Sequence, residues 1–497
     1  MYGLKRIRIP LATAAAAAIL GTGVTASVAA PNPATPAAKE QGPAPTAAFG
    51  SAAAKDSIPE GIIVGYKKRT DAARSDAEAR ADARAKGAKV GEHLGFDRRL
   101  GTGAALVGFD SKMAAEDVKD VMAAYASDPD VAYVVPDERM YATATPNDPL
   151  YTQQWDLFEN HAGMRVPGAW KRGITGKGVN VSVIDTGYVA HSDLAANIVP
   201  GYDFISDPSR ARDGDGRDSD PADQGDWVRR GECGTNAAGE PLPDRDRNNT
   251  WHGTHVSGTI AATANNSNGI TGIAHRARIQ PVRVLGKCGG STSDIIDAIT
   301  WSSGGTVWGV PRNRHPADVI NMSLGGGRTC DLGSQLAINA AVARGTTVVV
   351  SAGNENSDAA NQSPASCANV INVAASDREG NRAAYSNYGW TVDITAPGGE
   401  TKPNVTNGIL STLNSGTRGV GLENYDFYQG TSMAAPHITG LAALMYDANS
   451  RIRPAQVEAA IKLHARLLPG VCVGGCGAGL ADASATLASV RGFRLGR

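Results

Sequence analysis

The sequence predicts an α/β fold, in which a mostly parallel β-sheet is covered by helices on both faces. From residue 179 onward, near-continuous apolar runs alternate with amphipathic stretches. Apolar strands separated by helices are typical of a parallel sheet that is buried on both faces. The expected strands are Val179–Ile184, Ile279–Leu285, Val319–Leu324, Thr346–Ser351 and Val370–Val373, and helices are expected at Ser293–Trp301 and Leu332–Ala343.

A second, smaller domain is expected before this sheet. Its strands and helices alternate in a short α+β pattern, so residues 58–143 are assigned to it and residues 144–497 to the main domain. The expected strands are Ile62–Tyr66, Gly103–Phe109 and Val131–Val135, with helices at Ser75–Lys86 and Ala114–Ala126.

The N-terminus has the features of a secretory signal peptide. Basic residues at positions 5, 6 and 8 precede the apolar stretch Leu11–Val28, which ends in small residues. A membrane anchor is the alternative, but the apolar stretch is mostly Ala, Thr and Gly, so we expect removal of residues 1–30 and a secreted protein without a membrane attachment. Residues 31–57 are rich in Pro and Ala and read as a linker.

Composition limits the possible functions. Of 497 residues, 42% are apolar, which suits one or two globular domains. The 48 Lys and Arg residues nearly cancel the 49 Asp and Glu residues, so no basic field exists to hold nucleic acid. Six cysteines are too few for a disulfide scaffold but permit several disulfides, which persist outside the cell.

Four polar residues stand at the ends of predicted strands or the starts of helices: Asp185, His252, Asn354 and Ser432. Each alone has an ordinary interpretation, as a turn or cap for Asp185, a turn for Asn354 and an N-cap for Ser432. His252 and His255 could form a metal pair, but the zinc-protease pattern needs a Glu after the first His and a wider spacing.

Together the four residues favour one chemistry. Their order Asp, His, Ser is that of subtilisin. The motifs VIDTG, HGTHVSGT, SAGN and GTSMAAPH resemble the active-site motifs of the subtilases, and the resemblance covers roughly Asp148–Ala488. It implies that Ser432 is the nucleophile, His252 the general base, Asp185 the residue that orients the imidazole, and Asn354 an oxyanion donor. The expected function is a secreted serine endopeptidase of broad specificity, active near neutral or alkaline pH.

The same resemblance implies how substrates and the N-terminal domain act. Protein or peptide substrates would bind as an added strand between two exposed edges. The matching segments are Gly289, Gly290 and Ser291, and Ser323, Leu324 and Gly325, although turns are the alternative. Residues 58–143 resemble the family's ferredoxin-like propeptide, which would be an inhibitor and folding aid released by self-cleavage near residues 141–145.

Calcium and disulfides are also implied. Residues 263–270 resemble the family's calcium loop, and six oxygen ligands suit this cation. Those ligands would be the carbonyls of Thr263, Asn268 and Ile270, the Asn266 side chain, and the carboxylates of Asp193 and Asp148. A second acidic run resembles an EF-hand loop without its terminal Glu, and its alternative is a solvated loop; its carboxylates are Asp213, Asp215, Asp218, Asp220 and Asp223. Locality and resemblance favour the disulfides Cys233–Cys288, Cys330–Cys367 and Cys472–Cys476.

Two other functions fit the same motifs. One is a processing protease of narrow specificity, and the other is an inactive binding protein on the same fold. We expect a monomer, with one or two structural calcium ions.

Overall fold

The computed structural model describes residues 59, 61–109, 113–137, 145–236 and 238–490. The expected signal peptide, the whole linker and most of the expected self-cleavage segment lie outside these residues. No helix of the described part is long and apolar enough to cross a membrane.

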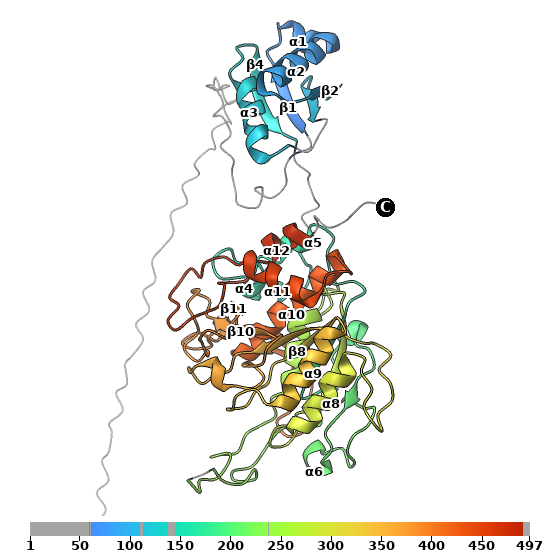
Figure 1. Cartoon of the computed structure of the whole chain (residues 1–497), viewed down its shortest axis with the longest axis vertical. Helices are drawn as coiled ribbons and strands as arrows, with labels where there is room; N and C mark the ends of the chain where they lie inside the picture. Colours follow the sequence, from blue (N-terminus) through green and yellow to red (C-terminus); the bar gives the residue numbers. More distant parts are fainter. Residues whose placement is uncertain (1–58, 60, 110–112, 138–144, 237, 491–497) are drawn as a thin grey trace, which may run out of the picture. The chain divides into compact units, whose positions relative to one another are not determined.

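The N-terminal domain is an α+β unit (Figure 1). It has its own hydrophobic core. Its antiparallel sheet has the order β2-β3-β1-β4 and the ferredoxin-like element order, with two helical segments between β1 and β2. Ile62 and Val64 of the sheet pack against Ala83 and Val121 of the helices. The elements are β1 Gly61–Tyr66, α1 Asp71–Arg74, α2 Asp76–Val90, β2 Leu94–Arg99, β3 Ala105–Phe109, α3 Ala115–Ala126 and β4 Val131–Pro136.

Strand β2 was not predicted from the sequence. Only Leu94 and Phe96 of this strand are buried, and it lies at the edge of the sheet. An edge strand with polar residues carries a weak apolar pattern, so it gave no signal.

The main domain contains a seven-stranded parallel sheet in the order β11-β10-β9-β8-β5-β7-β6. This confirms the predicted mostly parallel sheet. Five of its strands coincide with the expected ones to within a few residues, whereas β6 and β11 are short and were not expected. The strands are β5 Asn180–Asp185, β6 Tyr202–Asp203, β7 Arg278–Arg283, β8 Val319–Met322, β9 Thr347–Ser351, β10 Ile371–Ser376 and β11 Ile394–Pro397.

Helices cover both faces of this sheet, as predicted. One core joins strand residues such as Val181 to helices α7, α10, α11 and α12, and a second core joins Ile320 to α8 and α9. Helices α8 and α9 lie side by side (Figure 1). The helices are α4 Trp155–Phe158, α5 Pro167–Trp170, α6 Pro208–Ala211, α7 His252–Ala261, α8 Thr292–Ser302, α9 Leu332–Ala343, α10 Thr431–Ala448, α11 Pro454–Leu463 and α12 Ala483–Val490.

An antiparallel hairpin packs against α7. It consists of β12 Ile409–Asn414 and β13 Glu423–Tyr428. His255 of α7 donates its Nε2 proton to the carbonyls of Ile409 and Asp426, 3.1 and 3.2 Å away, and so joins both strands to the helix. His255 is fully buried in this contact, which gives it a structural role in place of the metal pair.

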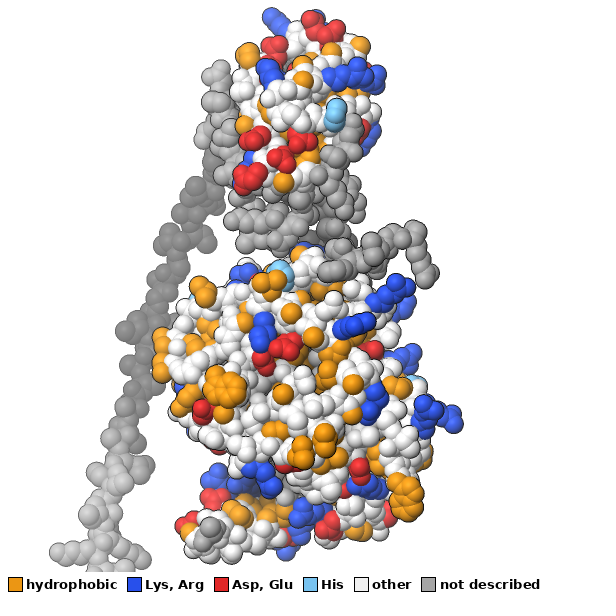
Figure 2. All heavy atoms as spheres, viewed as in Figure 1, with side chains coloured by type: hydrophobic (Ala, Val, Ile, Leu, Met, Phe, Trp, Pro, Cys, Tyr) orange, Lys and Arg blue, Asp and Glu red, His pale blue; other side chains and the backbone are white. Residues whose placement is uncertain are grey.

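The three favoured disulfides are present: Cys233–Cys288, Cys330–Cys367 and Cys472–Cys476. The first joins the long segment between Asp185 and His252 to the loop that follows β7. Lys and Arg side chains are scattered among Asp and Glu on the face shown in Figure 2, in keeping with the balanced charge of the sequence.

Candidate active site

Asp185 and His252 meet at the carboxyl edge of the sheet. Asp185 is the last residue of β5 and is fully buried, and His252 is the first residue of α7. Asp185 Oδ1 lies 2.8 Å from His252 Nδ1 and also accepts from the Thr186 N–H at 2.8 Å. Because a carboxylate can only accept, the proton of the neutral imidazole resides on Nδ1. Nε2 is therefore free to accept a proton.

The surroundings of His252 favour its protonated form. Burial by itself lowers the pKa of the imidazole, but the Asp185 carboxylate and its hydrogen bond, together with Asp226 and Asp223, raise the pKa above its ordinary value. The result is an imidazole that takes up a proton readily, which suits a general base that must hold a charge briefly.

Ser432 lies in the first turn of α10. It is the second residue of the helix, and Gly430 is the N-cap, so the interpretation of Ser432 as an N-cap is wrong. The first N–H groups of a helix have no intrahelical acceptor and carry partial positive charge. The Ser432 N–H therefore belongs to a helix end that favours a developing oxyanion.

The Ser432 hydroxyl donates to the Ser323 carbonyl at 3.2 Å, and the Ser323 hydroxyl donates to the Ser432 carbonyl at 2.8 Å. Among the described residues, the Ser432 hydroxyl thus hydrogen-bonds the Ser323 carbonyl and not the His252 imidazole. Contacts between a nucleophile and its base are commonly long or misaligned before substrate binds. The reciprocal pair places the segment after β8 directly beside Ser432.

Asn354 is held beside Ser432 by a neighbour that the sequence did not single out. The N–H and the hydroxyl of Thr431 donate to Asn354 Oδ1 at 2.9 and 3.0 Å. An acceptor of two protons must be the amide oxygen, so these bonds fix the orientation of the amide and leave Nδ2 as a donor. Asn354 is exposed, so Nδ2 can reach a bound ligand.

The two expected substrate segments follow strands β7 and β8, which lie on either side of β5 in the sheet. Gly289 and Gly290 are exposed and follow β7, which is the parallel neighbour of β5. A Cβ on Gly290 would lie 2.3 Å from the Val284 carbonyl oxygen, so this turn requires glycine. Ser291 caps α8 by accepting from the Asp294 N–H. In the second segment Ser323 is buried and Gly325 is exposed.

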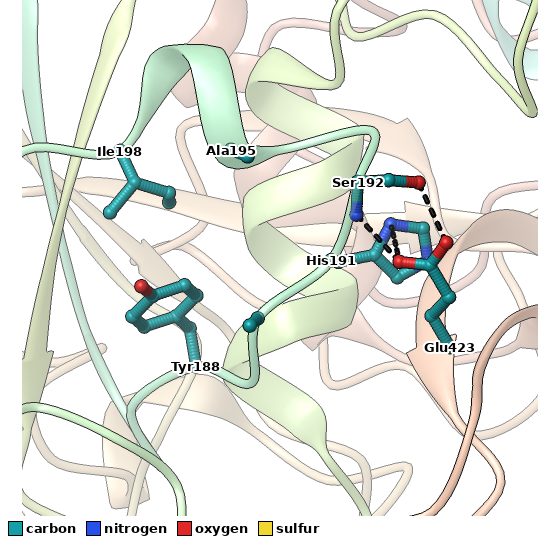
Figure 3. A pocket seen from close by; sticks show the side chains of 7 residues that line it. Tyr188, His191, Ser192, Ala195, Ile198 and Glu423 are labelled. Atoms are coloured by element: carbon teal, nitrogen blue, oxygen red, sulfur yellow. Dashed lines mark hydrogen bonds and ion pairs between the residues drawn. The ribbon is translucent and has the colours of Figure 1, made fainter.

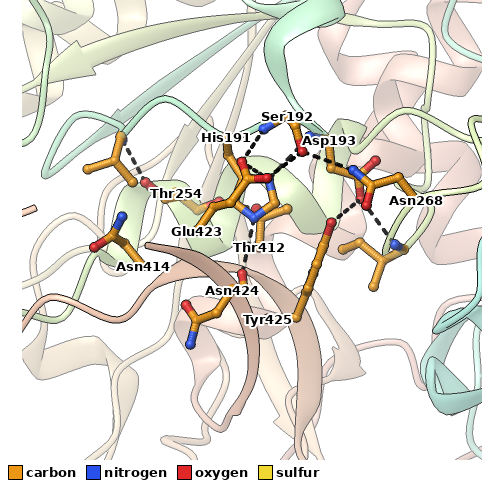
Figure 4. Close-up of polar contacts among 12 residues, drawn as sticks. His191, Ser192, Asp193, Thr254, Asn268, Thr412, Asn414, Glu423, Asn424 and Tyr425 are labelled. Atoms are coloured by element: carbon orange, nitrogen blue, oxygen red, sulfur yellow. Dashed lines mark hydrogen bonds and ion pairs between the residues drawn. The ribbon is translucent and has the colours of Figure 1, made fainter. Parts of the chain in front are cut away.

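The expected calcium ligands of the first loop come together. Asp148 accepts from the N–H groups of Asn265 and Asn266 at 2.9 and 3.2 Å. Asp193 accepts from Asn266 Nδ2 and from the Ile270 N–H at 2.7 and 3.0 Å. It also accepts from the Tyr425 hydroxyl at 3.2 Å (Figure 4). The Asp193 carboxylate is fully buried, and burial raises its pKa. All its donors are neutral, so a cation would stabilise its charge.

The acidic run behaves differently. Asp213 forms an ion pair with Arg283 at 2.7 Å, Asp218 and Asp220 accept from the backbone N–H groups two residues on, and Asp215 is exposed. Asp223 is buried and accepts from the Gly225 N–H. The five carboxylates do not gather around one point, because each has a separate partner or faces solvent. Within the described ranges no group of three or more His, Cys, Asp or Glu side chains is placed to hold a metal ion.

A pocket of about 510 Å³ lies beside the loop that follows β5, apart from the four motif residues (Figure 3). Tyr188 and Ile198 line one part of it. Glu423 lines another part and accepts from the N–H and the hydroxyl of Ser192 at 2.6 and 2.7 Å. The sequence gave no signal for this pocket, because Ser192 and Glu423 are 231 positions apart.

The model of the Subtilase family matches residues 176–485. The chain belongs to the subtilase family. It is 50% identical over 433 residues to an extracellular protease of Xanthomonas campestris pv. campestris, covering 86% of this chain and 72% of that protein. It is 44% identical over 454 residues to an extracellular basic protease of Dichelobacter nodosus, covering 89% and 73%.

A solved protease structure from Pseudoalteromonas arctica has 50% sequence identity and a TM-score of 0.67, and the match covers 70% of this chain and all of that one. This subtilase is therefore a secreted, subtilisin-like serine endopeptidase, as the sequence predicted.

Proposed function

We propose that Ser432, His252 and Asp185 form the catalytic triad of this subtilase and that Asn354 stabilises the oxyanion. The observation that carries the proposal is the 2.8 Å contact between Asp185 Oδ1 and His252 Nδ1, which leaves Nε2 as the base. The attachment of Asn354 to Thr431, the residue before Ser432, supports the second part.

In the proposed mechanism Ser432 Oγ attacks the carbonyl carbon of the scissile bond while His252 Nε2 takes the hydroxyl proton. The carbonyl oxygen becomes an oxyanion that accepts from Asn354 Nδ2 and the Ser432 N–H. The imidazolium, stabilised by Asp185, then gives its proton to the leaving amine as the C–N bond breaks. A water molecule releases the acyl group by the same steps in reverse, and Ser432 regains its proton.

For substrate binding, we propose that a peptide adds a strand between the segments Gly289–Ser291 and Ser323–Gly325. Exposed glycines on both segments would allow close backbone approach. Backbone recognition reads little side-chain identity, so the proposal is broad specificity. A processing protease of narrow specificity is the alternative, and a digest of a mixed peptide library distinguishes the two.

We further propose that the N-terminal domain is an inhibitory propeptide released by self-cleavage. Its support is a sheet and a core of its own, with the family match beginning only at residue 176. The N-terminal sequence of the secreted enzyme tests this, because cleavage near residues 141–145 is expected. A mature protein that still carries β1–β4 would contradict it.

Subtilases commonly bind structural calcium, and we propose one such site at residues 263–270. Asp148, Asp193, the Asn266 side chain and the carbonyls of Thr263, Asn268 and Ile270 would hold the ion. The buried Asp193 carboxylate, whose hydrogen-bond donors in the described part of the chain are all neutral, fits a cation at this place. The metal would supply positive charge to the loop and take no part in the bond cleavage.

The proposed triad is tested by casein hydrolysis with and without a serine-directed sulfonyl fluoride. We expect complete inhibition and one equivalent of label on Ser432. Hydrolysis that continues in fully labelled enzyme, or a label at another serine, would contradict the proposed triad. A protein that takes up no label and cleaves nothing would favour the inactive binding protein.

A further inference from the structure

The residue that precedes the proposed base has an unusual backbone conformation. Trp251 lies in the left-handed region, with a φ of +47° and a ψ of +36°. It is the only aromatic residue among the described non-glycine residues whose φ is positive. This region is unfavourable for a bulky L-amino acid, and such residues persist only where the surrounding structure holds them. The triad and the oxyanion donor do not account for this conformation.

The conformation of Trp251 determines how α7 begins. Trp251 is the N-cap of this helix, and its carbonyl accepts from the N–H groups of Thr254 and His255 at 3.1 and 3.2 Å. His252 is the first helical residue, and its imidazole has one hydrogen bond among the described residues, to Asp185. The position of the imidazole therefore depends on the backbone that carries it, and the left-handed residue directs that backbone.

The indole of Trp251 anchors this residue in the protein interior. Trp251 is 1% exposed, and its Nε1 donates to the Gly416 carbonyl at 2.7 Å. It packs in a cluster with Val189 and Leu413, against which Tyr428 also packs. Gly416 follows β12, and Tyr428 is the last residue of β13. The hairpin therefore supplies both the hydrogen-bond acceptor and part of the apolar contact.

The β12–β13 turn that accepts the indole bond has a defined structure of its own. The N–H groups of Gly416 and Gly421 donate to Asn414 Oδ1 at 3.0 and 2.7 Å, and so connect the two ends of the turn. The Thr417 carbonyl accepts from the Asn249 N–H at 2.9 Å. The turn is therefore fixed by its own side chain and also holds the start of the segment that leads to α7.

The residue before Trp251 is held from two other sides. The N–H and the hydroxyl of Thr250 donate to the Asp226 carboxylate at 2.7 and 2.8 Å. The Tyr428 hydroxyl donates at 2.8 Å to the Thr250 carbonyl, which belongs to the peptide bond that joins Thr250 to Trp251. Together with the indole bond, these contacts restrain the backbone at the left-handed residue.

We propose that Trp251 is a positioning residue for His252. Its indole, bound to the β12–β13 turn, keeps the backbone before α7 left-handed and so holds the imidazole against Asp185 with Nε2 free. The inference rests on the proposed role of His252 as the general base. Trp251 acts through the backbone and is not itself a catalytic residue.

The test compares Trp251→Ala with Trp251→Gly. Both variants lose the indole and its hydrogen bond, but only glycine adopts a positive φ without a steric cost. If the left-handed backbone positions His252, Trp251→Ala should lower kcat by on the order of 10²-fold, which is the loss that a misplaced catalytic group can cause. Trp251→Gly should retain a kcat at least about fivefold higher than that of Trp251→Ala. KM should stay unchanged in both, because the chemical step is affected and binding is not.

The measurement is steady-state kinetics on a small chromogenic peptide, with kcat expressed per Ser432 labelled to completion by a fluorophosphonate. Trp155 provides a matched control. It is also 1% exposed and donates its indole N–H to a glycine carbonyl, that of Gly408, at 2.9 Å, but it lies in helix α4. Trp155→Ala and Trp155→Gly should lower the melting temperature and leave kcat unchanged. Glycine should give no advantage over alanine there, because a helical residue does not require a positive φ.

Trp251→Phe keeps a buried aromatic ring and loses the indole N–H. Its kcat should fall by about fivefold with KM unchanged, the factor that corresponds to one lost hydrogen bond. Equal kcat values in Trp251→Ala and Trp251→Gly would overturn the proposal. If these two variants do not fold, a kcat of Trp251→Phe that equals that of the unaltered enzyme would overturn it instead. Labelled enzyme with either result contradicts only the role of Trp251, whereas unaltered enzyme that takes up no label contradicts the triad.

Discussion

The four active-site motifs and the acidic run 213–223 make an instructive comparison. Both are sets of polar residues from which the sequence predicts a joint site. Asp185 Oδ1 lies 2.8 Å from His252 Nδ1, although 67 positions separate the two residues. Asn354 hydrogen-bonds Thr431, the residue before Ser432, from 77 positions away. Asp213 and Asp223, ten positions apart, instead have unrelated partners.

The difference shows that proximity in sequence is weak evidence for a shared site. The active-site residues stand at the ends of strands and helices, and the parallel sheet brings such ends to one edge. The acidic run lies in a long connection whose Asp residues form local turns or ion pairs. A rigid scaffold therefore gathers distant residues more reliably than a loop gathers adjacent ones.

The sharpest test of the comparison is Ser432→Ala. If the motifs form one catalytic unit, this change should remove nearly all turnover, by on the order of 10⁶ in kcat, which is the magnitude that loss of the same nucleophile has in subtilisin. It should also block maturation. Expression alone in a protease-deficient host, followed by mass measurement of the secreted protein, checks this. A normally processed product would show that another protease releases the N-terminal domain.

The next largest effect is expected for Asn354→Ala. Loss of the Nδ2 donor should lower kcat by roughly 10²–10³ with KM little changed, and this magnitude is again the one found in subtilisin. Steady-state kinetics on a peptide substrate measures both constants. Thr431→Val should lower kcat less, because it removes only one of the two bonds to Asn354 Oδ1. A loss below tenfold in Asn354→Ala would leave Asn354 as a turn residue.

The pH dependence tests the electrostatics of the same unit. The base must be neutral to act, and the pKa of His252 is raised above its ordinary value of 6.5 by its carboxylate neighbours. Activity should therefore increase with pH and reach half its maximum above pH 6.5, falling about tenfold per unit below that point. Rates at constant ionic strength provide the measurement. A midpoint well below 6.5 would contradict this assignment of charges.

Metal binding at the proposed calcium loop, residues 263–270, should affect stability, with little direct effect on catalysis. Chelation should lower the melting temperature and speed autolysis, because a bound ion contributes about 2.7 kcal/mol when its free concentration is 100-fold above Kd. Asp193→Ala should reduce the response to added calcium. Calorimetry of the mature, inhibited enzyme with calcium and with chelator separates binding from autolysis. Identical melting temperatures with calcium and with chelator would contradict the proposed calcium site.

The smallest effect is expected in the acidic run. Asp215 is exposed and its carboxylate has no described partner, so Asp215→Ala should change the free energy of unfolding by less than about 0.5 kcal/mol. Its calcium response should equal that of the unaltered enzyme. A calcium-dependent loss of stability in this variant, with Asp193→Ala as the reference, would show that the run binds a metal and would break the comparison.

The sequence by itself determined the fold class and the family, and it predicted the four active-site residues. These are strong local signals, because apolar runs specify buried strands and the motifs supply their chemistry in a fixed order. It also favoured the disulfides that the structure contains. Strand β2 and the hairpin β12–β13 gave no comparable signal, because each of these strands mixes apolar with polar residues and lacks a continuous apolar run.

Only the tertiary structure decided how charges are shared. It paired Asp213 with Arg283 and attached Asn354 to Thr431. It also distinguished the two candidate calcium sites, because the burial and the partners of each carboxylate depend on which backbone lies opposite. Those contacts join positions far apart in the chain, so the local sequence pattern does not predict them.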